Sequence, residues 1–134
     1  MAVHRELGGG FSEIVYKDAL EYELTLRNIP FQREVRFQVN YKDIVLPHEY
    51  FADFVVFNEI ILEAKSVSEL KKEHYEKLIN YLAVSKNEVG FLINFRQSSL
   101  QYKRIIRSKE RFSYPTKGMN GVWEAPIKSA HLRV

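Results

Sequence analysis

The order of apolar patterns along this chain of 134 residues predicts an α/β fold, in which helices flank a mixed central sheet. A helical period over residues 11–28 comes first, several strand-like segments follow, and a second helical period over 69–84 precedes another strand over 88–95. Two further segments, 50–57 and 59–65, are almost continuously apolar, which is typical of central strands covered on both faces. The length fits a single domain.

The first helix has sequence signals at both ends. Ser12 is a suitable N-cap residue, and Glu13 in the first turn is favoured by the helix dipole. Apolar residues recur at helical spacings until Asn28-Ile29-Pro30 ends the pattern. We therefore expect a helix that starts next to Glu13 and ends before Pro30.

A group of strands follows this helix. Residues 31–39 alternate between apolar and polar side chains, and 40–43 has the composition of a turn. A short strand over 44–46 is expected next, interrupted by Pro47-His48, because proline cannot donate a ladder hydrogen bond. The two apolar strands complete the group.

The second helix is expected over 69–84, with Ser68 as its N-cap. Leucines and aromatic residues lie on one stripe of this helix and charged residues on the other. Strands over 88–95 and 100–106 follow it. The predicted order of helix, strands, helix and strand is that of an α/β sandwich around a small mixed sheet.

Composition and charge narrow the class of protein. The absence of cysteine excludes a disulfide scaffold and thiolate metal sites. The N-terminus has no apolar run typical of a signal peptide, and no segment approaches the length of a membrane span, so we expect a cytoplasmic protein without a membrane role. The net charge of +3 is uneven, because residues 107–134 carry +4 and residues 1–106 carry −1.

The C-terminal part differs in character from the rest. Prolines and glycines break every period there, at Pro115, Gly118, Gly121 and Pro126. The sequence therefore predicts one domain over residues 1–111 and a basic, loosely ordered tail over 112–134. A basic tail suits a polyanionic partner, although tails of this kind are common.

The strongest chemical signal lies in the two apolar strands. Asp53 is the single carboxylate of the first strand, and the second strand ends in Glu63-Ala64-Lys65. Because side chains alternate along a strand, Glu63 and Lys65 share a face. A charged side chain in such apolar surroundings is costly unless it is paired with an opposite charge, bound to a metal or needed for function. Two carboxylates, with the Ala64 carbonyl as a backbone ligand, could hold a magnesium-class ion, and Lys65 could orient a water or hold a phosphate oxygen.

Other side chains could join this site from the helices. Glu13 could reach it from the start of the first helix, where Tyr16 or Lys17 lies one turn further along the same side. On the second helix Lys77 and Tyr81 are four residues apart, so they share a face, and either could contact a phosphate.

Each of these residues also has a plain structural interpretation. The pair on the second strand could be an ordinary strand-end salt bridge, Asp53 an edge residue, and Glu13 a first-turn acid. Tyr16 and Tyr81 could simply be aromatic residues at the rim of the core. The chain has no Gly-x-Ser-x-Gly and no phosphate loop, so other hydrolytic chemistries have less support. The ordered set of residues, rather than any single one, favours phosphodiester hydrolysis.

The spacing Gly10-x-x-Glu13-x-x-Tyr16 resembles the signature of the GxxExxY family, a small branch of the PD-(D/E)XK nuclease superfamily. The resemblance covers about residues 3–106. Further matching segments are Val3-His4-Arg5-Glu6-Leu7-Gly8, Ala52-Asp53, Leu62-Glu63-Ala64-Lys65, His74, Leu78, Asn80-Tyr81-Leu82, residues 90–95 and Lys103-Arg104-Ile105.

The resemblance implies an α-β-β-β-α-β core in which Asp53, Glu63 and Lys65 form the D…ExK triad and Glu13 is an additional acid. It implies hydrolysis of nucleic acid, with DNA favoured over RNA, that depends on Mg²⁺ or Mn²⁺. Lys77 stands where the family usually has glutamine, and the family usually has most of a helix before Val3. An inactive module of the same fold that binds nucleic acid or assembles with a protein stays open as an alternative, as does a homo-oligomer.

Overall fold

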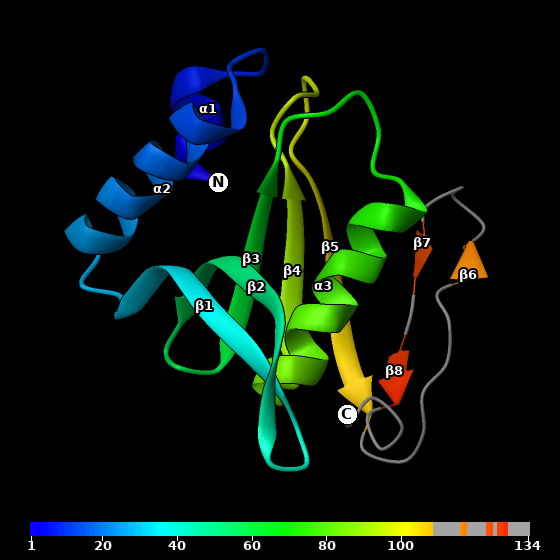
Figure 1. Cartoon of the computed structure of the whole chain (residues 1–134). Helices are drawn as coiled ribbons and strands as arrows, with labels where there is room; N and C mark the ends of the chain where they lie inside the picture. Colours follow the sequence, from blue (N-terminus) through cyan, green and yellow to red (C-terminus); the bar gives the residue numbers. More distant parts are fainter. Residues whose placement is uncertain (109–115, 118–122, 125, 129–134) are drawn as a thin grey trace.

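The computed structural model describes residues 1–108, 116–117, 123–124 and 126–128, which form a mixed sheet with helices on both faces (Figure 1). The principal elements are α1 (Ala2–Leu7), α2 (Glu13–Leu26), β1 (Phe31–Tyr41), β2 (Ile44–Val56), β3 (Ile60–Lys65), α3 (Lys72–Ser85), β4 (Val89–Asn94) and β5 (Gln101–Ser108). Three short strands follow, β6 (Thr116–Lys117), β7 (Trp123–Glu124) and β8 (Pro126–Lys128).

The main sheet has the strand order β1-β2-β3-β4-β5-β8. Strands β1, β2 and β3 form an antiparallel meander, whereas β3 and β4 are parallel and are joined by a crossover through α3. The predicted α/β class and the α-β-β-β-α-β core are therefore confirmed. None of the helices in the described part of the chain is long and apolar enough to cross a membrane.

Two apolar cores lie on opposite faces of the sheet. One core is packed under α3 and contains Tyr75, Leu78 and Leu82 together with residues of β2, β3 and β4. The other core lies under α1 and α2 and is built around Tyr16 and Phe54. Figure 1 shows the α1–α2 pair and α3 as separate layers on the two sides of the strands. The central strands are covered on both faces, as their continuous apolar character predicts.

Helix α2 begins and ends close to the predicted positions. Ser12 is its N-cap, although the Ser12 side chain makes no capping hydrogen bond, and the helix ends at Leu26. Tyr16, Leu20 and Leu24 recur every four residues and form its buried face. The structure adds the short helix α1, which the sequence pattern did not predict.

The predicted break in β2 at Pro47-His48 is wrong, because β2 runs unbroken from Ile44 to Val56. The pairing of β1 with β2 is irregular at this point. Gln38 pairs with Glu49 and Asn40 pairs with Val45, so residues 46–48 lie opposite a single residue of β1. Proline is tolerated in a bulge of this kind because no ladder hydrogen bond is required of it.

The predicted start of the second helix is also wrong. Helix α3 begins at Lys72 with Lys71 as its N-cap, three residues after the predicted start, and Ser68 lies before it. The reason is the side chain of His74, whose Nδ1 accepts a hydrogen bond of 2.8 Å from the Lys71 backbone N–H. This bond satisfies a backbone group at the helix start and so fixes where the helix begins.

Strand β1 changes faces at Glu34, which has a φ of +54°. Before this residue Phe31 packs on the α2 side of the sheet, and after it Val35 and Phe37 pack on the α3 side. A positive φ is uncommon for a residue other than glycine, so Glu34 is a locally strained point inside a regular strand. The part of β1 before Glu34 therefore contributes to the core under α2, and the part after it contributes to the core under α3.

Part of the segment predicted as a loose tail, 112–134, forms strands in the structure. Strand β8 pairs in parallel with β5, and β6 pairs with β7. The other residues of this segment lie outside the described part of the chain. The predicted domain boundary after residue 111 stays a prediction.

We predict that Gly9→Ala destabilises the fold by about 2 kcal/mol or more. A Cβ at Gly9 would overlap the carbonyl oxygen of Arg96 and lie 2.9 Å from its carbonyl carbon, which is backbone that cannot move aside as a side chain can. Urea unfolding followed by circular dichroism measures the change. Ser12→Ala is the control, because the Ser12 side chain is exposed and makes no capping bond, so it should change stability by less than about 0.5 kcal/mol. Equal stability of Gly9→Ala and wild type would contradict the prediction.

Candidate active site at the fork between β2 and β3

Strands β2 and β3 pair over only part of their length and then diverge. Their paired residues are Phe54↔Leu62, Val55↔Ile61 and Val56↔Ile60. Figure 1 shows β1 and β2 turning away from the direction of β3 and β4. The backbone N–H groups next to this fork lose their partners across the sheet, and buried N–H groups need a replacement.

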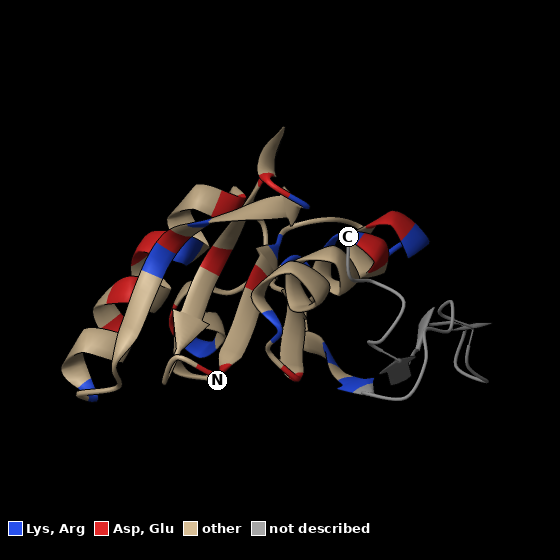
Figure 2. Ribbon diagram, turned by 60° about the horizontal axis from the view of Figure 1, so that its bottom comes forward, with Lys and Arg blue, Asp and Glu red and all other residues tan. Residues whose placement is uncertain are grey.

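Two carboxylates provide that replacement. The backbone N–H of Asp53 donates a hydrogen bond of 3.0 Å to Oε1 of Glu63, and the N–H of Ala64 donates one of 2.8 Å to Oδ2 of Asp53. Each carboxylate therefore binds the backbone of the other strand. The two predicted acids are brought together, with their positions fixed from both sides. Figure 2 shows acidic positions interrupting the largely uncharged strands near the middle of the sheet.

Both acids are buried, Asp53 at 7% and Glu63 at 1% exposure. Oε2 of Glu63 has no hydrogen-bond partner in the described part of the protein. Burial, followed by the nearby charge of Asp53, raises the pKa of Glu63 to about 8, against the opposing effects of the Asp53 N–H and of Lys77 and Lys65. In the absence of a cation, Glu63 is therefore protonated at neutral pH.

Lys65 is held at the end of β3 by Glu13. Its Nζ lies 3.7 Å from Oε1 of Glu13, and the Lys65 side chain is only 12% exposed. The start of α2 is thus placed next to the end of β3, as the sequence predicts for Glu13. Lys65 also acts on Glu63 electrostatically, since its charge opposes the rise in the pKa of Glu63.

Lys17, which the sequence offers only as an alternative to Tyr16 on the first helix, is a member of the cluster. Its Nζ lies 3.1 Å from Oδ1 of Asp53 and 3.2 Å from Oε1 of Glu34. Burial lowers the pKa of Lys17, but the charges and hydrogen bonds of Asp53 and Glu34 outweigh it and leave the pKa raised. The sequence signal for this residue is its position four residues after Glu13, on the same side of the helix.

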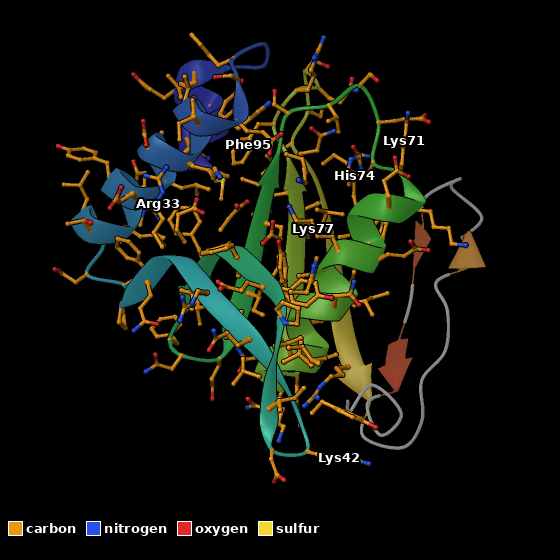
Figure 3. The ribbon with its side chains drawn as sticks, in the orientation of Figure 1. Arg33, Lys42, Lys71, His74, Lys77 and Phe95 are labelled. Atoms are coloured by element: carbon orange, nitrogen blue, oxygen red, sulfur yellow. The ribbon has the colours of Figure 1, made fainter. Side chains whose placement is uncertain are left out.

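Lys77 and Tyr81 approach the acids from α3. Nζ of Lys77 lies 5.7 Å from the centre of the Tyr81 ring, and Figure 3 shows Lys77 on the side of α3 toward β3 and β4. Burial and the charges of Glu63 and Asp53 raise the pKa of Tyr81. The Tyr81 ring is buried and packs against Tyr50, whereas Lys77 is exposed. Of this pair, Lys77 is therefore the residue that the structure leaves accessible to a substrate.

Tyr16 is placed where it holds the fold together. Its hydroxyl donates a hydrogen bond of 2.6 Å to the Gly8 carbonyl and accepts one of 3.2 Å from the Phe11 N–H. The ring is fully buried and stacks on Phe95 at 4.6 Å. This geometry closes the loop between α1 and α2 and does not support the predicted contact of Tyr16 with a substrate.

The donor set fits a divalent cation. Among the described residues no group of three or more acidic or histidine side chains is arranged to hold a metal ion. Mg²⁺, however, keeps several waters and commonly uses one or two protein carboxylates. Asp53 and Glu63 supply two, and Oε2 of Glu63 is a buried oxygen without a hydrogen-bond partner among the described residues, which a cation could occupy once Glu63 loses its proton. The Ala64 N–H is used by Asp53, and a role for the Ala64 carbonyl as a ligand stays a prediction.

Comparison with known proteins gives a family and a fold. The model of a family described as the PD-(D/E)XK nuclease superfamily matches residues 1–105, which contain all the predicted site residues. The crystal structure of SSO0001 is similar with a TM-score of 0.54 and 22% identity, over 67% of this chain and 47% of that one, which shows a shared fold. This chain thus spans about half the length of that structure. No protein with a curated description matches it.

We predict that Glu63→Gln stabilises the metal-free protein at alkaline pH. The pKa of Glu63 is higher in the folded protein, at about 8, than its ordinary value of 4.5. Its contribution to stability is therefore fully present below pH 4.5 and is lost as the pH rises through about 8. Glutamine keeps the acceptor oxygen for the Asp53 N–H and cannot ionise. Its advantage over wild type should exceed about 1 kcal/mol at pH 9 and be smaller at pH 5.

Thermal and urea unfolding at these two pH values, in a metal chelator, measure this difference. Glu59→Gln is the matched control, because Glu59 is exposed at the other end of the same hairpin. It should behave like wild type at both pH values. A Glu63→Gln protein that is less stable than wild type at pH 9 would show that Glu63 is ionised and well compensated in the native state.

Proposed function

This chain belongs to the PD-(D/E)XK nuclease superfamily, and on that premise we propose that it is a nuclease that uses a divalent ion, Mg²⁺ or Mn²⁺, to hydrolyse phosphodiester bonds in nucleic acid. The observation that carries the proposal is the acid pair at the fork. Asp53 and Glu63 are fixed by each other's backbone, Glu63 has a buried oxygen without a partner, and Lys65 lies on the same strand face as Glu63.

In this proposal Asp53 and Glu63 hold the ion. A divalent ion bound there would lower the pKa of a coordinated water and neutralise charge on the phosphate. Glu63 has to lose its proton to become a ligand, and Asp53 keeps its carboxylate oriented through the Ala64 N–H. The hydrogen bonds from the Asp53 and Ala64 N–H groups hold both carboxylates in place before an ion enters.

Lys65 orients the attacking water or donates a hydrogen bond to a phosphate oxygen, because it is a cation on the same strand face as Glu63. Glu13 positions Lys65 through their ion pair and supports the ion directly or through water. Lys77, the exposed cation of α3, contacts the phosphate backbone of the substrate.

DNA is the first substrate to test, ahead of RNA, and the narrower assignment to the GxxExxY family is part of the same proposal. The residues that support this assignment have structural roles. Gly10 has a φ of +106°, which favours glycine, Glu13 pairs with Lys65, and Tyr16 closes the loop before α2. An inactive module of the same fold is distinguished from the nuclease by the cleavage experiment.

We predict that the protein cleaves supercoiled plasmid or single-stranded DNA in Mg²⁺ or Mn²⁺, and that Lys65→Met lowers the rate at least about a hundredfold, because it removes a charge that stabilises the transition state. Methionine keeps most of the buried stem of Lys65. Structured RNA in a parallel reaction separates the two nucleic acids.

Lys72→Met is the control for this experiment. Lys72 forms an exposed pair with Glu76 at 3.6 Å on the surface of α3, so its loss removes the same charge away from the acids. Its rate should stay within a few-fold of wild type. Cleavage by Lys65→Met at the wild-type rate would remove Lys65 from the mechanism. Folded wild-type protein that cleaves no substrate with either ion would favour the binding or assembly module.

We also predict that the affinity for Mg²⁺ rises with pH and levels off above about pH 8. The pKa of Glu63 is about 8, so the ion must displace a proton at lower pH. The apparent Kd should fall by up to about tenfold per pH unit between pH 6 and 8. Titration calorimetry in two buffers with different heats of ionisation counts the released protons. Close to one proton per ion is expected at pH 6.5 and almost none at pH 9.

Glu63→Gln provides the comparison for this titration. Its binding of Mg²⁺ should be weaker and largely independent of pH. Wild-type protein that binds Mg²⁺ with the same Kd and no proton release at both pH values would mean that Glu63 is not a ligand.

A further inference from the structure

The ammonium group of Lys17 occupies a position between two carboxylates at the edge of the site. It comes from α2, while its partners come from β2 and β1, Asp53 at 3.1 Å and Glu34 at 3.2 Å. The Lys17 and Asp53 side chains are both largely buried, at 16% and 10% exposure, whereas Glu34 is half exposed. A cation of this chain is therefore already bound to one of the two acids proposed to hold the metal.

We propose that Lys17 is an internal counter-ion that balances Asp53 when no metal is bound, and that a divalent ion displaces it from Asp53 onto Glu34. This inference rests on the proposed function, since it concerns the same acid pair. It adds a residue that controls the strength of metal binding, and it assigns Glu34 the role of receiving the displaced lysine.

The competition follows from how the oxygens of Asp53 are used. Oδ2 accepts the Ala64 N–H at 2.8 Å, and Oδ1 is the oxygen that Lys17 contacts. A metal ion that binds through Oδ1 therefore meets an ammonium group at the same atom, and two cations repel each other strongly at such short range. Glu63 has no equivalent block, because its Oε2 has no hydrogen-bond partner among the described residues. Of the two lysines whose charges act on Glu63, Lys65 is paired with Glu13 and Lys77 lies over the Tyr81 ring.

Lys17 also explains how the metal-free protein tolerates Asp53. A buried charge without a partner destabilises a fold by several kcal/mol, and the ion pair with Lys17 avoids that cost. Asp53 and Glu63 are consequently balanced in different ways, the first by a lysine and the second by its raised pKa.

Glu34 is suited to receive the lysine. Its carboxylate is already within 3.2 Å of Nζ, so the ammonium can move away from Asp53 without losing every ionic partner. The backbone of Glu34, with its φ of +54°, is the strained point at which β1 changes faces, opposite Asp53. Strain of this kind persists only where the surrounding structure holds it. It places a half-exposed acid next to a largely buried one, with one lysine between them.

The test is titration calorimetry of the full chain with Mg²⁺ alone, without nucleic acid. Lys17→Met removes the competitor and should bind Mg²⁺ roughly tenfold more tightly than wild type. Glu34→Gln removes the alternative partner and should bind it several-fold more weakly. Lys72→Met, which removes an exposed lysine paired with Glu76, should leave the Kd unchanged. Circular dichroism checks the fold of each variant, and Lys17→Gln replaces Lys17→Met if the latter does not fold.

The double variant Lys17→Met/Glu34→Gln separates this inference from its nearest competitor. If Glu34 acts only through Lys17, the double variant binds Mg²⁺ as tightly as Lys17→Met, and the inference holds. If Glu34 is itself a ligand, the double variant binds more weakly than Lys17→Met, which overturns it. Unchanged or weaker binding by Lys17→Met, with wild type binding normally, overturns the inference but leaves the proposed function standing. Absence of binding in all variants removes the metal from the proposed function and this inference with it.

Discussion

The structure depends on the exchange of backbone hydrogen bonds for side-chain ones where β2 leaves β3. A sheet that divides uncovers N–H groups in its interior, and such groups cannot stay unpaired. The Asp53 carboxylate accepts a hydrogen bond from the Ala64 N–H, and the Glu63 carboxyl group accepts one from the Asp53 N–H. The same two bonds hold a pair of carboxylates in the apolar interior. The topology of the sheet and the position of the acids therefore have one common cause.

Two lysines then connect the acids to the N-terminal helix. Lys17 extends from α2 to Asp53, and Lys65 extends from β3 to Glu13 on α2. These pairs run in opposite directions between the helix and the sheet, so together they fix the distance and the rotation of α2 over the fork. The low exposure of both lysine side chains means that solvent screens the pairs less than it screens exposed ones. The two ion pairs consequently add polar links between α2 and strands β2 and β3 to the apolar packing on the faces of the sheet.

Much of this arrangement could be predicted from the sequence, because it follows from periodicity. The α/β class, the helix after Ser12 and the shared face of Glu63 and Lys65 depend on local patterns that need no knowledge of neighbours. The strand through Pro47 and the late start of α3 could not be predicted in the same way, since a bulge and the His74 side chain decide them. The ion pairs of Lys17 could not be predicted either, because they also depend on an irregular backbone.

Those partners depend on β1 changing faces at Glu34. A strict alternation places every second residue of β1 on one face, and the positive φ of Glu34 reverses it at that residue. No pattern of residue types marks that reversal, because glutamic acid rarely adopts this conformation. The structure brings the two predicted acids together and adds Lys17 to the cations around them.

The short separation of Asp53 and Glu63 along the chain has a consequence for the order of folding. The two residues are ten apart and belong to one antiparallel meander, so they can meet after a small loop has closed. The parallel pairing of β3 with β4, in contrast, must wait until the chain has passed through α3. Contacts of low sequence separation generally form early. We expect the acid pair to assemble in the first part of folding, before the layer of α3 covers it.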